Sequence, residues 1–283
     1  MHIEDWVHAY KLIPFSPKRK IYRKVVMWVE AIRKGRRADK IGTIPINGSH
    51  AVELQLDLNI WLQRECFYFN SFEWYVFNFV KSILKEGDIA IDIGANIGYY
   101  TTIFSRLVGP SGHVFAFEPS SNFYSQLQQN IALNNDNNIS TYKLVVGNDN
   151  TPQTLMSGSQ SASIVLGDPE SEQIVKEVVD TITLDQFIEQ HDCPVNLLKI
   201  DVNGWDYNVL LGATNLLKVK RPIVIVEVID WGIIEPLKIY LLMKEHTYNV
   251  FFEQDTSVAL SASDFNGLIA KIHGLNLICV PIN

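Results

Sequence analysis

The sequence predicts an α/β protein whose sheet is mostly parallel and covered by helices on both faces. From about residue 88 onward, short continuous apolar strands alternate with helical segments. Strands that are apolar at every position are typical of parallel sheets buried on both faces. The composition is 47% hydrophobic and 19% charged, which excludes a disordered chain. With 283 residues, the chain can form one large domain of this class with an N-terminal extension.

The N-terminal segment is basic, unlike the rest of the chain. Residues 1–40 contain eleven Lys and Arg against four acids, a net charge of +7, and residues 41–283 contain thirteen against twenty-seven, a net charge of −14. Residues 19–38 carry apolar side chains at steps of three and four, which predicts an amphipathic helix. This basic arm could meet an anionic membrane, nucleic acid or the acidic body of its own protein, and self-docking is the simplest interpretation.

A small β element is expected after the arm. Residues 42–60 alternate loosely between polar and apolar around Asn47-Gly48, which predicts a hairpin. Residues 72–85 read as a buried helix. We therefore expect an N-terminal arm with a hairpin over residues 1–72, and a ligand-binding domain over residues 73–283.

The remaining elements follow the alternating pattern. Strands are expected at 89–93, 113–117, 141–146, 196–200 and 223–228, and helices near 98–107, 121–133, 206–218 and 235–245. Two further strands, 248–252 and 275–280, suggest an antiparallel edge, and residues 147–180 predict loops with a local hairpin. The pattern Thr183-x-x-Gln186 predicts a capped helix, whose first turn Asp185 would stabilise.

The cysteines and the apolar runs of the sequence indicate where in the cell the protein is located. The three cysteines have no metal-binding spacing and are expected to be reduced thiols. The first residues lack the apolar core of a secretory signal, and there is no run of about 18 apolar residues that would predict a spanning helix. We expect a cytoplasmic protein without a transmembrane segment; its oligomeric state is left open.

Residues 88–102, DIAIDIGANIGYYTT, run from a strand through a glycine turn into a helix, where parallel sheets bind ligands. Gly94 and Gly98 are spaced G-x-x-x-G, unlike the dinucleotide pattern G-x-G-x-x-G. Asp92 would repel a pyrophosphate and suits a cation, and Glu118, at the end of the second strand, suits a ribose. These features favour a cationic adenosine ligand, and S-adenosylmethionine fits. A nicotinamide-dependent oxidoreductase is the alternative that the glycine spacing disfavours.

Five runs occur in one order along the chain: GDIAIDIGANIGYYTT, FEPSSNFYSQLQQNIALNN, TITLDQF, KIDVNGWDYNVLLGA and RPIVIVEV. Over roughly residues 73–230 they resemble the FkbM family of S-adenosylmethionine-dependent methyltransferases. The resemblance implies a class I methyltransferase (Rossmann-like) fold, with seven mostly parallel strands and an antiparallel last strand. It also implies O-methylation of a hydroxyl on a sugar, a glycan precursor or a polyketide-type small molecule.

The resemblance also implies cofactor-binding residues. Asp92, Gly94, Asn96 and Gly98 would line the methionine end of the cofactor, Glu118 would bind its ribose, and Val146–Asp149, including Asn148 and Asp149, would lie near its adenine.

The end of the fourth strand carries the expected chemistry. Asp201 is the favoured base for the acceptor hydroxyl, with Glu227 at the end of the next strand beside it. A divalent cation held by Asp201, Asp206 and Glu227, with Asp230 as a further ligand, is a less favoured alternative. Asp201 could instead serve as a helix cap or as the partner of Lys199.

The chain departs from its family at this strand end. Where the family usually has K-I-D-V-E-G-A-E, this chain has K-I-D-V-N-G-W-D, so Asn203 replaces a glutamate, Trp205 a small residue, and Asp206 shortens an acid. We expect acceptor choice to depend on this turn. Trp205 could stack on a sugar ring or pack under the N-terminal arm. A non-catalytic, methyltransferase-like binding module is therefore kept as an alternative, and nucleic acid is the less favoured substrate because the body is acidic.

Overall fold

The computed structural model describes residues 39–47, 50–69, 72–158, 162–163, 175–229, 236–272 and 274–282. The expected helix at 19–38, most of the basic arm, Gly48 and Asp230 lie outside the described residues. The chain divides into two compact units, Met1–Phe77 and Asn78–Asn283. Among the described helices, none is long and apolar enough to cross a membrane.

The first unit contains the expected hairpin. Strands β1 (Asp39–Asn47) and β2 (His50–Asp57) pair antiparallel. Their alternation buries one face: Ile44, Ile46, Val52, Leu54 and Leu56. The helix α3 (Trp61–Phe69) follows, which the sequence did not predict. Its start is fixed by Gln63, whose side-chain oxygen accepts a hydrogen bond of 2.6 Å from the Asp57 N–H.

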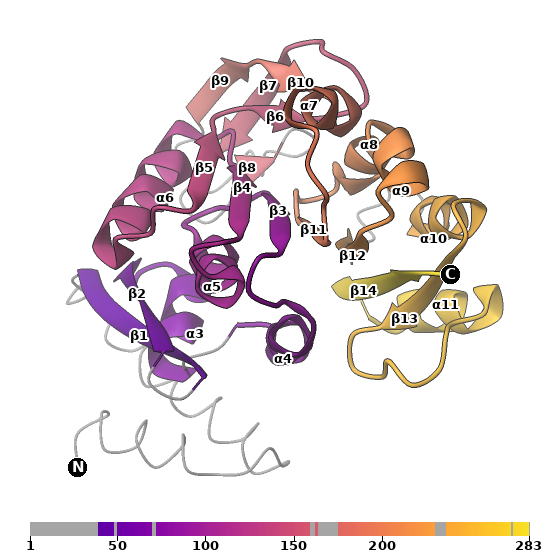
Figure 1. Cartoon of the computed structure of the whole chain (residues 1–283), viewed down its shortest axis with the longest axis horizontal. Coiled ribbons are helices and arrows are strands. Elements are labelled where there is room, and N and C mark those ends of the chain that lie inside the picture. Colours follow the sequence, from indigo (N-terminus) through magenta and orange to yellow (C-terminus); the bar gives the residue numbers. More distant parts are fainter. Residues whose placement is uncertain are drawn as a thin grey trace. The chain divides into compact units, whose positions relative to one another are not determined.

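The second unit is built on a seven-stranded sheet of order β13-β14-β12-β11-β3-β4-β5 (Figure 1). Its strands are β3 (Ile89–Ile93), β4 (His113–Phe117), β5 (Ile139–Tyr142), β11 (Leu197–Ile200), β12 (Ile223–Ile229), β13 (Tyr248–Phe252) and β14 (Gly274–Pro281). The neighbouring pairs from β12 to β5 are parallel, and β14 runs antiparallel to both β12 and β13. This is the predicted class I methyltransferase sheet.

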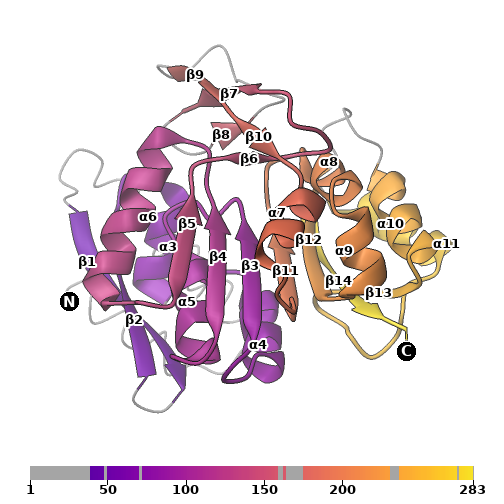
Figure 2. The same ribbon diagram turned by 45° about the horizontal axis from the view of Figure 1, so that its top comes forward.

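Helices cover both faces of this sheet (Figure 2). They are α5 (Tyr99–Val108), α6 (Ser121–Asn134), α7 (Leu184–His191), α8 (Asp206–Leu211), α9 (Thr214–Val219), α10 (Pro236–Glu245) and α11 (Ala262–Ile269), and α4 (Trp74–Ile83) precedes the sheet. Successive strand residues point to opposite faces. Phe115 and Phe117 accordingly join the core formed with α7 to α10, whereas Ala116 packs against Leu127 of α6.

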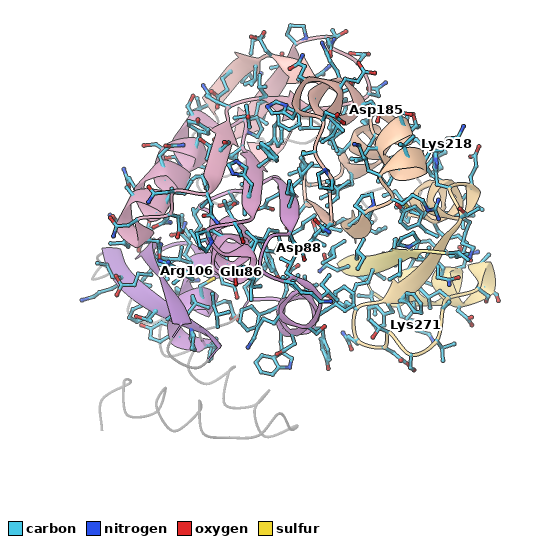
Figure 3. The ribbon with its side chains drawn as sticks, in the orientation of Figure 1. Glu86, Asp88, Arg106, Asp185, Lys218 and Lys271 are labelled. Atoms are coloured by element: carbon cyan, nitrogen blue, oxygen red, sulfur yellow. The ribbon has the colours of Figure 1, made fainter. Side chains whose placement is uncertain are left out.

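The helix expected at 206–218 is interrupted at Gly212 and Ala213, giving α8 and α9. Asp185 accounts for the second start, because its carboxylate accepts hydrogen bonds from the N–H groups of Asn215 and Leu216 at 2.9 and 2.8 Å. Asp185 therefore caps α9 from the neighbouring α7 (Figure 3), and it also lies in the first turn of its own helix, as expected. Thr183 does cap α7, accepting a hydrogen bond from the Gln186 N–H.

The segment between β5 and α7 is more ordered than expected. The strand predicted at 141–146 ends at Tyr142, and β6 (Val145–Val146) pairs instead with β10 (Thr181–Ile182). Between them, β7 (Gln153–Ser157), β8 (Ala162–Ser163) and β9 (Val175–Val179) form a three-stranded antiparallel sheet. This small sheet lies beyond the carboxyl ends of β4 and β5 (Figure 1 and Figure 2).

Candidate active site

The glycine turn after β3 packs directly on the end of β11. Gly94 has φ +80°, and a Cβ at this position would lie 1.9 Å from the Asp201 carbonyl oxygen. Only glycine satisfies both conditions. The N–H groups of Gly94 and Ala95 donate to the Phe117 carbonyl oxygen at 2.9 Å, which ties the turn to β4. Gly98, with φ +90°, begins α5 where a Cβ would lie 2.8 Å from Leu127.

Glu118 is fixed at the end of β4 by two main-chain donors. Its carboxylate oxygens accept hydrogen bonds from the Asn96 N–H at 2.8 Å and the Ser120 N–H at 2.9 Å. The side chain is 4% exposed, and burial raises its pKa to about 7 despite these two hydrogen bonds. Glu118 thus joins the turn after β3 to the loop after β4. Asn96 contributes its main-chain N–H, and its own side chain accepts from the Ile97 N–H.

Asp92, which the sequence analysis placed beside the methionine end of the cofactor, is buried within the second unit. It is 1% exposed and accepts a hydrogen bond of 2.6 Å from the Thr101 hydroxyl on α5. Burial raises its pKa, whereas the Lys199 charge and the Thr101 hydrogen bond act in the opposite direction. In the described conformation, Asp92 anchors α5 to β3, and direct contact with a cofactor stays a prediction.

Asp201 directly follows β11 and keeps part of its side chain accessible. Its Oδ2 lies 2.9 Å from the Lys199 Nζ, and its side chain is 25% exposed, against 2% for Lys199. Burial would raise the pKa of Asp201, but the Lys199 ammonium and hydrogen bonds from Lys199 and Glu227 hold it below its usual value. Two of the predicted catalytic carboxyls, Asp201 and Glu227, are therefore brought together.

The turn after Asp201 is held by Asp206. Asn203 and Gly204 have φ values of +50° and +89°, and the Asp206 carboxylate accepts hydrogen bonds from the Val202 and Gly204 N–H groups at 3.1 and 3.0 Å. Asn tolerates the left-handed conformation better than the glutamate typical of the family. Asp206 is 2% exposed, and burial together with the Asp201 charge raises its pKa to about 7. Its carboxylate faces its own turn, so this geometry does not support a catalytic role.

Trp205 packs within the second unit. Its indole lies against Val145, Leu155 and Val179, which belong to β6, β7 and β9. Its Nε1 is buried with no hydrogen-bond partner among the described residues. Stacking on a sugar ring stays a prediction, and the arm lies outside the described residues. Trp205 supports the small sheet that covers the carboxyl edge.

Asn148 and Asp149 lie in an exposed loop after β6. Asp149 accepts a hydrogen bond of 2.8 Å from the Thr151 N–H, which lowers its pKa. The neighbouring Gly147 donates its N–H to the Ile182 carbonyl oxygen, which fixes the base of the loop. The proposed contact with adenine stays a prediction.

The small sheet is bound to the loop after β4, a feature that the sequence did not indicate. Glu177 of β9 accepts hydrogen bonds from the Ser121 N–H and hydroxyl at 2.9 and 2.5 Å and pairs with Lys143 at 3.2 Å. Ser157 of β7 lies 3.2 Å from the Ser120 hydroxyl. The Ser120 N–H also donates a hydrogen bond to Glu118. The loop after β4 therefore contacts both the small sheet and Glu118, the carboxylate expected to bind the ribose.

No group of three or more His, Cys, Asp or Glu side chains is arranged to hold a metal ion in the described part of the chain. Asp206, one of the ligands considered, turns toward main-chain N–H groups, and Asp230 lies outside the described residues. The alternative of a bound divalent cation stays a prediction.

A seven-stranded sheet with one antiparallel strand, a glycine turn after its first strand and acids at the carboxyl ends of its central strands define a class I methyltransferase fold. A family model, the methyltransferase FkbM domain, matches residues 92–250, more than half of the chain. The protein belongs to the FkbM methyltransferase family.

A curated relative is the hexuronic acid methyltransferase AglP of Haloferax volcanii. It is 28% identical over 148 residues, which cover 47% of this chain and 53% of the relative. The chain thus spans about half the length of this relative.

Two solved structures are similar to this chain at low sequence identity. A ribosomal protein L11 methylase from Lactobacillus delbrueckii is 12% identical, with a TM-score of 0.48, and the match covers 86% of this chain and all of that one. A methyltransferase FkbM from Methylobacillus flagellatus is 13% identical, with a TM-score of 0.43, and the match covers 76% of this chain and 54% of the other.

Proposed function

We propose that this protein is an S-adenosylmethionine-dependent O-methyltransferase that methylates a hydroxyl of a saccharide or a related small molecule. The observation that carries the proposal is Asp201, a partly exposed carboxylate whose pKa is held below its usual value, in main-chain contact with the Gly94 turn. Family membership supports the transfer of a methyl group. The relative named for hexuronic acid supports a saccharide acceptor.

The residues after β3 and β4 fit the proposed cofactor. Gly94 and Gly98 both have positive φ, so glycine gives the turn after β3 a backbone conformation that other residues rarely adopt. Glu118 has a fixed carboxylate suited to ribose hydroxyls. The buried acids Asp92 and Glu118 favour a cation and disfavour a pyrophosphate. S-adenosylmethionine, when bound, supplies the methyl group as an electrophilic carbon on a sulfonium.

The protein's own residues orient the acceptor and take its proton. Methyl transfer is an in-line displacement, so the acceptor oxygen must be aligned and water excluded. The hydroxyl proton passes to the Asp201 carboxylate as the new oxygen–carbon bond forms. The Gly94–Asp201 main-chain contact fixes where this carboxylate stands relative to the cofactor turn.

The proposal is tested by incubating the full chain with methyl-labelled S-adenosylmethionine and a panel of neutral hexosides and hexuronic acids. We expect S-adenosylhomocysteine to accumulate and a methyl ether to appear by NMR with at least one acceptor. Asp201→Asn should lose about 10²- to 10⁴-fold in turnover while still binding the cofactor. The proposal fails if calorimetry detects binding of neither S-adenosylmethionine nor S-adenosylhomocysteine.

A further inference from the structure

Lys199 is a buried cation in an otherwise apolar strand. It is 2% exposed and stands opposite Asp92 in the parallel pairing of β11 with β3. Its Nζ lies 2.9 Å from the Asp201 Oδ2 and 4.7 Å from the centroid of the Tyr100 ring on α5. Burying an ammonium is costly unless charged and polar groups compensate it. The two acids and the aromatic ring therefore compensate the cost of burying the Lys199 ammonium.

Four carboxyl groups lie near the Lys199 ammonium or near Asp201, the acid that contacts it. Asp92 approaches from β3, Glu227 from β12 and Asp206 from α8, and Asp201 itself follows β11. Asp201 is the member that directly contacts Lys199 through a hydrogen bond. Glu227 lies close enough to Asp201 for their side chains to interact, and two carboxyl groups can form a hydrogen bond only if one of them carries a proton.

We propose that Lys199 is a positioning residue that keeps Asp201 ionised, so that the proton shared by the carboxyl pair rests on Glu227. This inference rests on the function proposed above. It assigns different roles to two neighbouring acids: Asp201 is the proton acceptor, and Glu227 is a neutral hydrogen-bond donor. The Lys199 ammonium selects between them because it contacts Asp201.

The proton balance of a turnover follows from this arrangement. As the acceptor oxygen bonds to the methyl carbon, the carbon–sulfur bond breaks and the hydroxyl proton moves to Asp201. Asp201 and Glu227 are then both neutral beside the Lys199 ammonium. One proton leaves to solvent, since both carboxyl groups are only partly buried. The Asp201 carboxylate is then restored for the next cycle.

The pH dependence of turnover in Lys199→Met tests the proposal. This substitution removes the charge but keeps an unbranched side chain. Without the ammonium, the pKa of Asp201 rises, and more of this carboxyl is protonated at any given pH. The acidic limb of the kcat profile should therefore move up by about 1–3 pH units, with activity recovering at high pH. Lys199→Arg, which retains the charge, should keep the limb near that of the native protein.

Cofactor binding separates this test from that of the proposed function. If Lys199→Met binds S-adenosylhomocysteine in calorimetry and transfers methyl groups, but its acidic limb matches that of the native protein, the role of Lys199 is overturned. If the native protein itself neither binds the cofactor nor transfers a methyl group, it is the proposed function that fails.

A second measurement avoids dependence on the folding of Lys199 variants and on activity. Infrared difference spectra of the native protein against Glu227→Gln, at pH 8, should show the loss of a protonated carboxyl band. The same comparison against Asp201→Asn should show the loss of an ionised carboxylate band. The opposite assignment of the two bands, or two ionised carboxylates, would overturn the proposal.

Discussion

Replacing Glu118 with Gln should separate cofactor binding from stability. The two Glu118 oxygens accept the Asn96 and Ser120 N–H groups, and the side chain is 4% exposed. An amide of the same shape has one oxygen and one NH₂ group. One of the two main-chain donors therefore loses its acceptor and faces another donor, and the charge available to ribose hydroxyls is lost.

The expected stability change is the balance of two terms. Burial raises the pKa of Glu118 from 4.5 to about 7, so its ionised form costs the folded state about 3 kcal/mol at pH 8. Gln removes that cost, which already includes the two hydrogen bonds to the carboxylate, but it leaves one buried main-chain donor without an acceptor, a penalty of about 1–3 kcal/mol. At pH 8 the free energy of unfolding should therefore change by no more than about 2 kcal/mol.

The pH dependence of that change has a definite sign. An acid whose pKa is raised by folding contributes stability below about 4.5 and loses it as the pH rises to about 7. The native protein loses this contribution between pH 5 and pH 8, and Glu118→Gln does not. The variant should therefore gain stability relative to the native protein as the pH increases, which denaturant unfolding at both pH values measures.

Cofactor affinity should respond much more strongly. Loss of charge-assisted hydrogen bonds to the ribose should weaken S-adenosylhomocysteine binding by about 10- to 100-fold at pH 8, measured by calorimetry. Glu189→Gln, on the exposed side of α7, is the matched control and should bind like the native protein. If Glu118→Gln binds within threefold of the native protein, our placement of the ribose at this carboxylate is refuted.

Three further predictions follow from the same region. Gly94→Ala should destabilise the fold by several kcal/mol, because its Cβ would lie 1.9 Å from the Asp201 carbonyl oxygen; a denaturation midpoint near that of the native protein would contradict this. Asp185→Ala should cost about 1–2 kcal/mol in the free energy of unfolding by uncapping α9, without weakening cofactor binding; an unchanged unfolding midpoint would count against the cap. Affinity for S-adenosylmethionine should be higher at pH 8 than at pH 6, because Glu118, with a pKa of about 7, accepts hydrogen bonds best when ionised; calorimetry in two buffers should show proton release, and equal affinity at both pH values would exclude this dependence.

The sheet could be predicted from the sequence because its central strands are continuous apolar runs. The runs IAIDI and HVFAF correspond to β3 and β4 at the predicted residues. Parallel pairing then places Asp92, Glu118 and Asp201 at one edge, so their proximity followed from topology. The helix α3, WLQRECFYF, was missed because it buries two polar residues, Gln63 and Glu65, which a pattern of apolar residues does not reveal.

Side-chain direction in the candidate site could not be predicted. A sequence shows that Asp201 and Asp206 are five residues apart by position, but not that the second turns back to main-chain N–H groups. Lys199 did leave a signal, since a lone cation inside a buried strand requires partners. Its burial opposite Asp92 became evident only from the strand register.

The main-chain contact between Gly94 and Asp201 also bears on how such an enzyme can change its acceptor. The spacing between the Gly94 turn and Asp201 is set by main-chain atoms, so replacements of the side chains around this contact leave it unchanged as long as Gly94 is kept. The next residues, Asn203 to Trp205, belong to a turn held separately by Asp206. We therefore expect that this turn can change to suit new acceptors without altering the spacing between the Gly94 turn and Asp201.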